Sequence, residues 1–410
     1  MYQQTSGRKD SRSGNLKALN DFRDCKSSHE KHSNRFTRDS SPHLPHVGSP
    51  SGTGTMVYRP ERETHSYSIH GILDVESPVP LSELGFFEVK KTNSADIVIR
   101  PLTSKQKSVG SRKIIVSNES ATYSEHMDSL GAKVHIGFSK NPLEVEVSRL
   151  LLKSRHVLYV NIVEPLLRLV LASKGYVLLH AACLSANRNG YLISAPPDTG
   201  KTTTILKCMK NSNFSFLSDD MTVVDRSGIL YAFPKPLTIS AHTFGALSRV
   251  SSRKALSLKM RGYAHCRMGR KILRLLGRLS IVSILTINAL AQYVVRPPKV
   301  KITEVMKHVK LGSPVGLRSM YFLTKGRSGV RPISTEEAVS RAVANSDDAF
   351  FFPPYDKIFP HLCIEGLPFN LLMARERQII KEALSNCNCF VVMSDDHGWS
   401  TRICRAIRSD

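Results

Sequence analysis

Between residues 160 and 240 the apolar residues of the chain fall into short runs, and the spacing within each run indicates a helix or a strand. Residues 162–172 repeat apolar side chains at helical spacing, which predicts a helix. Residues 176–180 and 190–194 are short apolar runs bounded by turn residues, which predicts buried strands. The same signs predict strands at 214–218, 230–233 and 320–323. Strands that alternate with helices indicate an α/β core.

Outside this core the pattern changes in two places. Residues 1–60 are rich in Ser, Arg, Lys, His, Gly and Pro and lack apolar periodicity, which predicts a disordered basic arm. In residues 61–150, short β-rich pieces such as 95–99 and 113–116 alternate with turn residues, which predicts a small strand-rich lobe. The main domain is therefore expected over residues 151–410.

A phosphate-binding motif follows the strand predicted at 190–194. Residues 195–202 read Ala-Pro-Pro-Asp-Thr-Gly-Lys-Thr and fit G-x-x-x-x-G-K-[ST] with Ala at the first position, and a helix is predicted directly after them. In such a loop the backbone N–H groups and the positive helix end hold phosphate. Lys201 would reach the β and γ phosphates of ATP, and the Thr202 hydroxyl would ligate Mg²⁺. The expected nucleotide contacts are Ala195, Asp198, Thr199, Gly200, Lys201, Thr202 and Thr203.

Two carboxylates end the strand predicted at 214–218. Asp219 and Asp220 stand where an acidic strand end can ligate Mg²⁺ and accept a proton from a substrate hydroxyl. Asp220 is assigned with Thr202 to the metal, and either aspartate remains a candidate for the base. The alternative is a solvated turn without a chemical role.

The residues 178–225 resemble the catalytic core of the HPr kinase family, within the phosphoenolpyruvate carboxykinase-like P-loop group. His180 precedes Lys201 by 21 positions and Asp219 follows it by 18, spacings similar to those of the family. The resemblance implies a mixed β-sheet wrapped by helices, catalytic roles for Lys201 and for Asp219 or Asp220, and His180 on the acceptor side. The family's downstream Gly-rich signature is missing and a basic insertion stands there instead, so the phosphocarrier serine that these kinases modify is not carried over.

The basic insertion at about 249–310 concentrates the charge of the chain. The whole chain carries +24, and this stretch holds fifteen Lys or Arg and one acid, Glu304, which gives 15 − 1 = +14. Such a segment attracts phosphate on an anionic membrane, on a substrate or on nucleic acid. The uncharged run 279–295 is shorter than the ~20 residues of a membrane span. It predicts a helix that lies on a membrane surface, closes over a substrate, or packs on the core.

These features predict an ATP- and Mg²⁺-dependent phosphotransferase whose acceptor is a hydroxyl on a small metabolite, a lipid-linked alcohol or a protein serine. One alternative is a regulatory or assembly protein that binds ATP without transferring phosphate. Another is a nucleic-acid-binding protein, which no recognisable motif supports. The eight cysteines lack zinc-site or disulfide-scaffold spacing and the start lacks a secretory apolar region, so a cytoplasmic protein is expected, with peripheral membrane contact through 249–310. The oligomeric state stays open.

Overall fold

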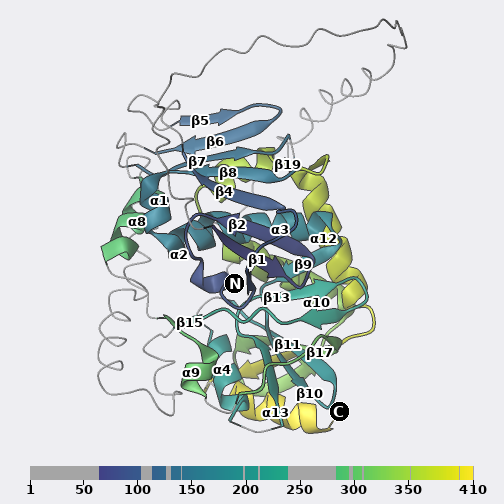
Figure 1. Cartoon of the computed structure of the whole chain (residues 1–410). Helices are drawn as coiled ribbons and strands as arrows, with labels where there is room; N and C mark the ends of the chain where they lie inside the picture. Colours follow the sequence, from purple (N-terminus) through teal and green to yellow (C-terminus); the bar gives the residue numbers. More distant parts are fainter. Residues whose placement is uncertain are drawn as a thin grey trace, which may run out of the picture. The chain divides into compact units, whose positions relative to one another are not determined.

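The chain is a mixed α/β protein built on two large mixed β-sheets (Figure 1). This coarse class agrees with the class expected from the sequence. A computed structural model describes residues 64–102, 113–125, 131–139, 141–196, 199–210, 213–238, 283–294, 299–306, 309–350, 352–396 and 398–409. The arm predicted at 1–60 and most of the basic insertion lie outside these ranges.

The first sheet is formed by the N-terminal strands, in the order β3-β1-β2-β4-β8-β7-β6-β5 within the described residues. The neighbours β2, β4 and β8 run parallel, and the remaining pairs are antiparallel. Along β8 the buried and exposed positions alternate, which is the period-2 pattern of a sheet with one face on a core. The strands are β1 His65–Ile69, β2 Leu73–Ser77, β3 Glu88–Val89, β4 Ile97–Pro101, β5 Lys113–Val116, β6 Ser120–Ser124, β7 Lys133–Gly137 and β8 Leu143–Val147.

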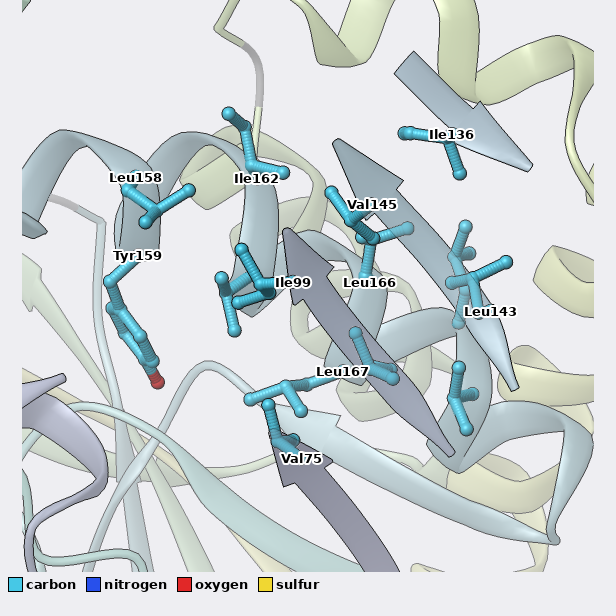
Figure 2. Close-up of a cluster of buried hydrophobic side chains, with 14 of the residues drawn as sticks. Val75, Ile99, Ile136, Leu143, Val145, Leu158, Tyr159, Ile162, Leu166 and Leu167 are labelled. Atoms are coloured by element: carbon cyan, nitrogen blue, oxygen red, sulfur yellow. The ribbon is translucent and has the colours of Figure 1, made fainter. Parts of the chain in front are cut away.

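One long helical segment packs on this sheet. It comprises α1 Arg149–Lys153, α2 Arg155–Leu158, a π-helical turn at Tyr159–Val163 and α3 Glu164–Ser173. Figure 2 shows apolar side chains of the sheet and of this segment pointing toward one another. Residues 155–173 are apolar and long enough to cross a membrane, but 89% of the most apolar window is buried inside the protein. Its apolar side chains are therefore buried in the protein core.

The second sheet contains the strands predicted around the motif. Among described residues its path is β12-β10-β11-β17-β14-β13-β9, with β21 beside β17 and β18 beside β21. The central strand β17 pairs in parallel with β11 and with β21. The strands are β9 Tyr176–Leu179, β10 Ala182–Ala186, β11 Asn189–Ser194, β12 Ser215–Ser218, β13 Thr222–Asp225, β14 Ile229–Tyr231, β17 Val315–Lys325, β18 Gly329–Pro332 and β21 Asn388–Ser394.

Helices from distant parts of the chain pack against this sheet. The helices α4 Lys201–Cys208 and α13 Trp399–Ser409 lie side by side (Figure 1) and share one hydrophobic cluster. A different cluster joins the sheet to α10 Thr335–Phe350 and α12 Phe369–Ala383. Trp399 begins α13 and is buried, and its indole N–H donates to the carbonyl of Thr324 at 3.1 Å.

Shorter elements complete the described residues. A two-stranded ribbon pairs β15 with β16, so residues 237–238 and 299–300 lie side by side. These elements are η1 Ser82–Leu84, β15 Leu237–Thr238, α8 Ile284–Val294, β16 Lys299–Val300, α9 Ile302–Val305, α11 Tyr355–Ile358, η4 Phe359–His361, β19 Cys363–Ile364 and β20 Leu367–Pro368.

The helix α8 belongs to the apolar run of the basic insertion, and it packs on the protein. Both oxygens of the buried Glu125 carboxylate accept backbone N–H groups of its first turn, from Leu285 at 3.1 Å and Thr286 at 2.7 Å. Leu285, Thr286 and Ala289 are buried. This carboxylate satisfies N–H groups that a helix start leaves without intrahelical partners and lies at its positive end. Of the expectations for the run, packing on the core therefore describes α8.

A buried ion-pair group, here called the Arg168 cluster, joins three helices. The guanidinium of Arg168 on α3 donates to both carboxylate oxygens of Glu376 on α12, at 2.7 and 2.6 Å, and to Asp347 on α10 at 2.7 Å. The Arg168 side chain is fully buried and that of Glu376 nearly so. Burial disfavours the charge of Arg168, but Glu376 and Asp347 outweigh it and raise its pKa further. The cluster holds α10 beside the second sheet.

Candidate active site

The predicted phosphate loop connects the end of β11 to the start of α4, which is the strand–loop–helix context that the motif requires. Gly200 has a φ of 114° at the N-terminal boundary of α4, a left-handed conformation that glycine adopts without a Cβ clash. Ala195 and Thr199 are buried, and Thr202 and Thr203 are partly exposed in the first helical turn. Asp198 lies outside the described residues. The sequence thus places its glycine at the position where the backbone turns.

The loop lysine meets the second predicted aspartate. The Lys201 ammonium donates to the side-chain Oδ1 of Asp220 at 3.3 Å and to its backbone carbonyl at 3.2 Å. Lys201 lies on α4 and Asp220 follows β12, so two segments 19 positions apart converge. The Lys201 side chain is 10% exposed and that of Asp220 is 39% exposed. The carboxylate is therefore the part of this pair that an incoming ligand can reach.

His180 joins the same carboxylate from the end of β9. Its Nε2 lies 3.2 Å from Asp220 Oδ1, and its Nδ1 lies 2.9 Å from the backbone carbonyl of Asn345 on α10. A carbonyl oxygen only accepts, so Nδ1 carries a proton. The Nε2 contact with the Asp220 carboxylate is an ion pair when the imidazole is protonated.

Further hydrogen bonds fix His180 relative to the loop. Ser194, the last residue of β11, donates its hydroxyl to the His180 carbonyl at 3.1 Å. The Asn345 side-chain amide donates to that Ser194 hydroxyl at 3.0 Å, and the hydroxyl of Ser346 accepts the His180 backbone N–H at 3.3 Å. His180, the start of the loop and α10 are thus held as one unit.

Two residues that were not assigned a role from the sequence complete the site. Lys235 donates to Asp220 Oδ2 at 2.6 Å and to Glu164 Oε1 at 2.5 Å, and its side chain is 9% exposed. Glu164 also accepts the Tyr159 hydroxyl at 3.2 Å. The sequence could have indicated Glu164, because it is the single acid in an apolar helical run and a buried charge needs a partner. Lys235 stands between two prolines in residues 233–237, which resemble the strand and turn after the paired aspartates in kinase-like relatives, but that resemblance gave Lys235 no chemical role.

These contacts join His180, Lys201, Asp220, Lys235 and Glu164, and together with the adjacent Asp219, whose charge influences the pKa of Lys201, they are here called the Asp220 cluster. The structure brings together His180, Lys201, Asp219 and Asp220 from the sequence prediction, and Lys235 and Glu164 join them. Two lysine ammonium groups and the His180 imidazole contact the one carboxylate of Asp220.

Burial and charge move the proton affinities of this cluster in different directions. Burial alone would raise the pKa of Asp220, but Lys235, Lys201 and His180 hold it well below its usual range. For Asp219, burial and then the neighbouring Asp220 charge raise the pKa to about 7. Burial lowers the pKa of Lys201, and the aspartates offset this only in part. The two adjacent aspartates are therefore suited to different tasks, one permanently ionised and one able to take up a proton near neutral pH.

Lys235 and Glu164 form the buried side of the Asp220 cluster. Burial opposes the charge of Lys235, but Asp220 and Glu164 outweigh it and raise its pKa. Burial raises the pKa of Glu164, and Lys235 counteracts this. Lys235 is thus a firmly charged group between two carboxylates.

The oxygen donors fit a hard cation better than a soft one. Asp219, Asp220 and Thr202 offer carboxylate and hydroxyl oxygens, the ligand types that Mg²⁺ prefers, and Mg²⁺ commonly takes its other ligands from water and phosphate. In the part of the chain that the structure describes, no three His, Cys, Asp or Glu side chains form a dedicated metal cage.

Comparison of the sequence with protein-family models and with curated proteins finds no match. The resemblance to HPr kinases therefore stays a prediction carried by the motif residues and their spacing.

Proposed function

We propose that the chain is an ATP-dependent phosphotransferase that transfers the γ-phosphate of ATP to a hydroxyl acceptor. The observation that carries this proposal is the convergence of Lys201, His180 and the Asp219–Asp220 pair at one end of the second sheet, directly beside the loop between β11 and α4. A phosphate loop alone indicates nucleotide binding. A phosphate loop beside a carboxylate with a pKa near neutrality also provides a base for the acceptor.

In the proposed site Lys201 and the N-terminal N–H groups of α4 bind the phosphates of ATP. Thr202 and Asp220 hold Mg²⁺, which offsets negative charge on the phosphates when it is bound. Lys201 exchanges its contact with Asp220 for the nucleotide, a change that costs little because Asp220 keeps Lys235 and His180 as partners.

Asp219 serves as the general base in this proposal. It is 95% shielded from solvent and has a pKa of about 7, so near neutral pH a substantial fraction is ionised and able to accept the acceptor's hydroxyl proton. Asp220 is the weaker candidate for this role, because the cations around it reduce its affinity for a proton. His180 and Lys235 orient Asp220, and Lys201 offsets the negative charge of the transferred group.

The hydroxyl acceptor belongs to one of three classes, namely small metabolites, lipid-linked alcohols and protein serines. Purified full-length protein should be incubated with γ-labelled ATP, Mg²⁺ and fractionated cell lysate, and the label followed into protein, lipid and small-molecule fractions. The proposal expects label in one fraction, with no label when Lys201→Ala replaces the wild type. The Lys207→Ala variant is the matched control, because Lys207 is an exposed lysine on the same helix.

Two outcomes would contradict the proposal. If calorimetry finds tight ATP·Mg²⁺ binding but no fraction accepts label, the chain is better described as an ATP-binding regulatory or assembly protein. If ATP does not bind at all, the motif is a coincidence of sequence and both ATP-based hypotheses fail.

A further inference from the structure

Two cysteines that are 196 positions apart in the sequence meet where α4 packs on α13. The Sγ atoms of Cys208 and Cys404 lie 3.0 Å apart. Cys208 is the last residue of α4, and Cys404 lies in the middle of α13. A disulfide needs a sulfur separation of about 2.05 Å, so the two atoms would have to approach by roughly 1 Å.

The two thiols differ in access to solvent and in acidity. Cys208 is fully buried, whereas Cys404 is partly exposed. The hydrogen bond with Cys208 lowers the pKa of Cys404, and the Arg408 guanidinium one helical turn further on lowers it again. The same hydrogen bond and burial raise the pKa of Cys208. Since the thiolate is the reactive form, Cys404 is the sulfur that an oxidant reaches and attacks first.

We propose that Cys404 and Cys208 form a thiol-oxidation site that reacts with a hydroperoxide and closes to a disulfide between α13 and α4. The Cys404 thiolate attacks one oxygen of hydrogen peroxide, an S–O bond forms, the O–O bond breaks and hydroxide leaves. The Cys208 sulfur then attacks the Cys404 sulfur, the S–S bond forms and the S–O bond breaks, with water as the leaving group. In total two thiols and one hydrogen peroxide give one disulfide and two waters.

This site lies outside the Asp220 cluster and does not rest on the proposed function. It nevertheless involves the helix whose first turn carries Lys201 and Thr202. A covalent bond at the opposite end of that eight-residue helix joins it to α13. Because the bond would close a long stretch of chain, it restricts the unfolded state and stabilises the described core.

Other cysteines of the chain provide internal controls. Cys387 and Cys389 lie 3.9 Å apart but are separated by only one residue, so a bond between them would close a very short loop. Cys183 is fully buried, and burial raises its pKa. Cys363 is partly exposed like Cys404 and has no sulfur partner among the described residues. A chemistry governed by exposure alone would therefore oxidise Cys363 as readily as Cys404.

The test uses the full chain treated with increasing hydrogen peroxide, blocked with a thiol alkylator and digested with trypsin without reductant. Cleavage after Lys and Arg isolates the two cysteines in the peptides 208–210 and 403–405. We expect these two peptides as a linked pair that has lost two hydrogens and separates on reduction. The linked pair should appear before oxidation of Cys363, and Tm should rise by roughly 5 °C and return on reduction.

The Cys404→Ser variant should lose the linked pair, and Cys363→Ser should keep it. The measurement on the wild type needs no variant to fold, so it decides the proposal by itself. If peroxide converts Cys404 to sulfinic acid without the linked pair, or oxidises Cys363 first, the proposal is wrong.

Discussion

The Arg168 cluster and the Asp220 cluster are both groups of ion pairs with buried members, and burial disfavours the charged forms in both, but the partner charges outweigh burial to different extents. In the Arg168 cluster one guanidinium faces two carboxylates, and its pKa moves further from neutrality. In the Asp220 cluster the pKa values of Asp220 and Lys235 also move away from neutrality, but that of Asp219 rises to about 7 and that of Lys201 falls, so these two move toward neutrality. The comparison teaches that a buried ion pair alone does not mark a reactive site. A group whose pKa is shifted toward neutrality is a better sign of a reactive site.

The largest expected effect concerns the Asp220 cluster, which is the proposed reactive site. Lys201→Ala should lower phosphate transfer at least ~1000-fold, because a charge that contacts phosphate in a partly desolvated site is not replaced by water. Transfer of label from ATP measures the rate, and calorimetry measures ATP affinity. Lys207→Ala should leave both near the wild-type values. A folded Lys201→Ala protein with normal ATP affinity and turnover would end the assignment of the loop.

A second substitution tests whether the Arg168 cluster stabilises the fold. Arg168→Met should lower the free energy of unfolding by about 3–5 kcal/mol, because it leaves the Glu376 carboxylate buried without its cation. Chemical denaturation measures this change. Arg226→Met is the control, since the Arg226–Glu382 pair is solvent-exposed at 3.5 Å and such pairs contribute about 0–1 kcal/mol. Equal losses in the two variants would show that the Arg168 cluster is not a buried anchor.

The two aspartates sharpen the comparison within the reactive cluster. Asp219→Asn and Asp220→Asn should each lower turnover by about 100-fold or more, the range for loss of a general acid–base group. Only Asp220→Asn should also weaken the dependence on Mg²⁺, whereas Asp219→Asn should retain ATP affinity. Titration of the transfer rate with Mg²⁺ separates the two roles. Near-normal rates in both variants would favour the regulatory alternative.

The smallest expected effect is on the pH dependence of the free energy of unfolding. The folded state holds a proton on Asp219 up to a pKa of about 7, whereas the unfolded state releases it near the ordinary value of 3.8. Between these values the folded state binds more protons, so this residue makes stability fall as pH rises. Asp219→Asn should therefore become more stable than the wild type as pH rises from 4 to 8, by on the order of 1 kcal/mol or more. Denaturation at both pH values measures it, and a constant difference would contradict the raised pKa.

The sequence predicted the elements whose apolar pattern is local. The helix around 162–172 and the strands β9, β11, β12, β14 and β17 occupy the predicted positions within a few residues, although β17 extends well beyond 320–323. The antiparallel strand β10 was missed, because the run 182–186 separates two stronger apolar runs and contains small residues that suit a turn equally well. Length and strand order depend on pairing with distant segments, which no local window contains.

For the site, sequence reasoning predicted four residues of the cluster because they lie in or near one motif. It did not assign Lys235 or Glu164, since their significance arises only when α3 and the turn after β14 converge on Asp220. It also left the choice between the two aspartates open, because the difference depends on which carboxylate faces Lys201, Lys235 and His180. Most of the basic insertion at 249–310, through which membrane contact was expected, lies outside the described residues, and so do its basic residues Arg267, Arg270, Lys271 and Arg274.

Trp399 gives this protein a built-in optical probe. It is the single tryptophan of the chain, and it is 1% exposed at the start of α13, in the hydrophobic cluster that includes α4. The aromatic side chains of the first sheet that the structure describes, such as Tyr67 and Tyr123, are tyrosines. Excitation selective for indole therefore reports on the α4–α13 region alone, while signals from the peptide backbone report on both sheets. A difference between the two unfolding curves would reveal whether the two halves of this chain melt together or in sequence.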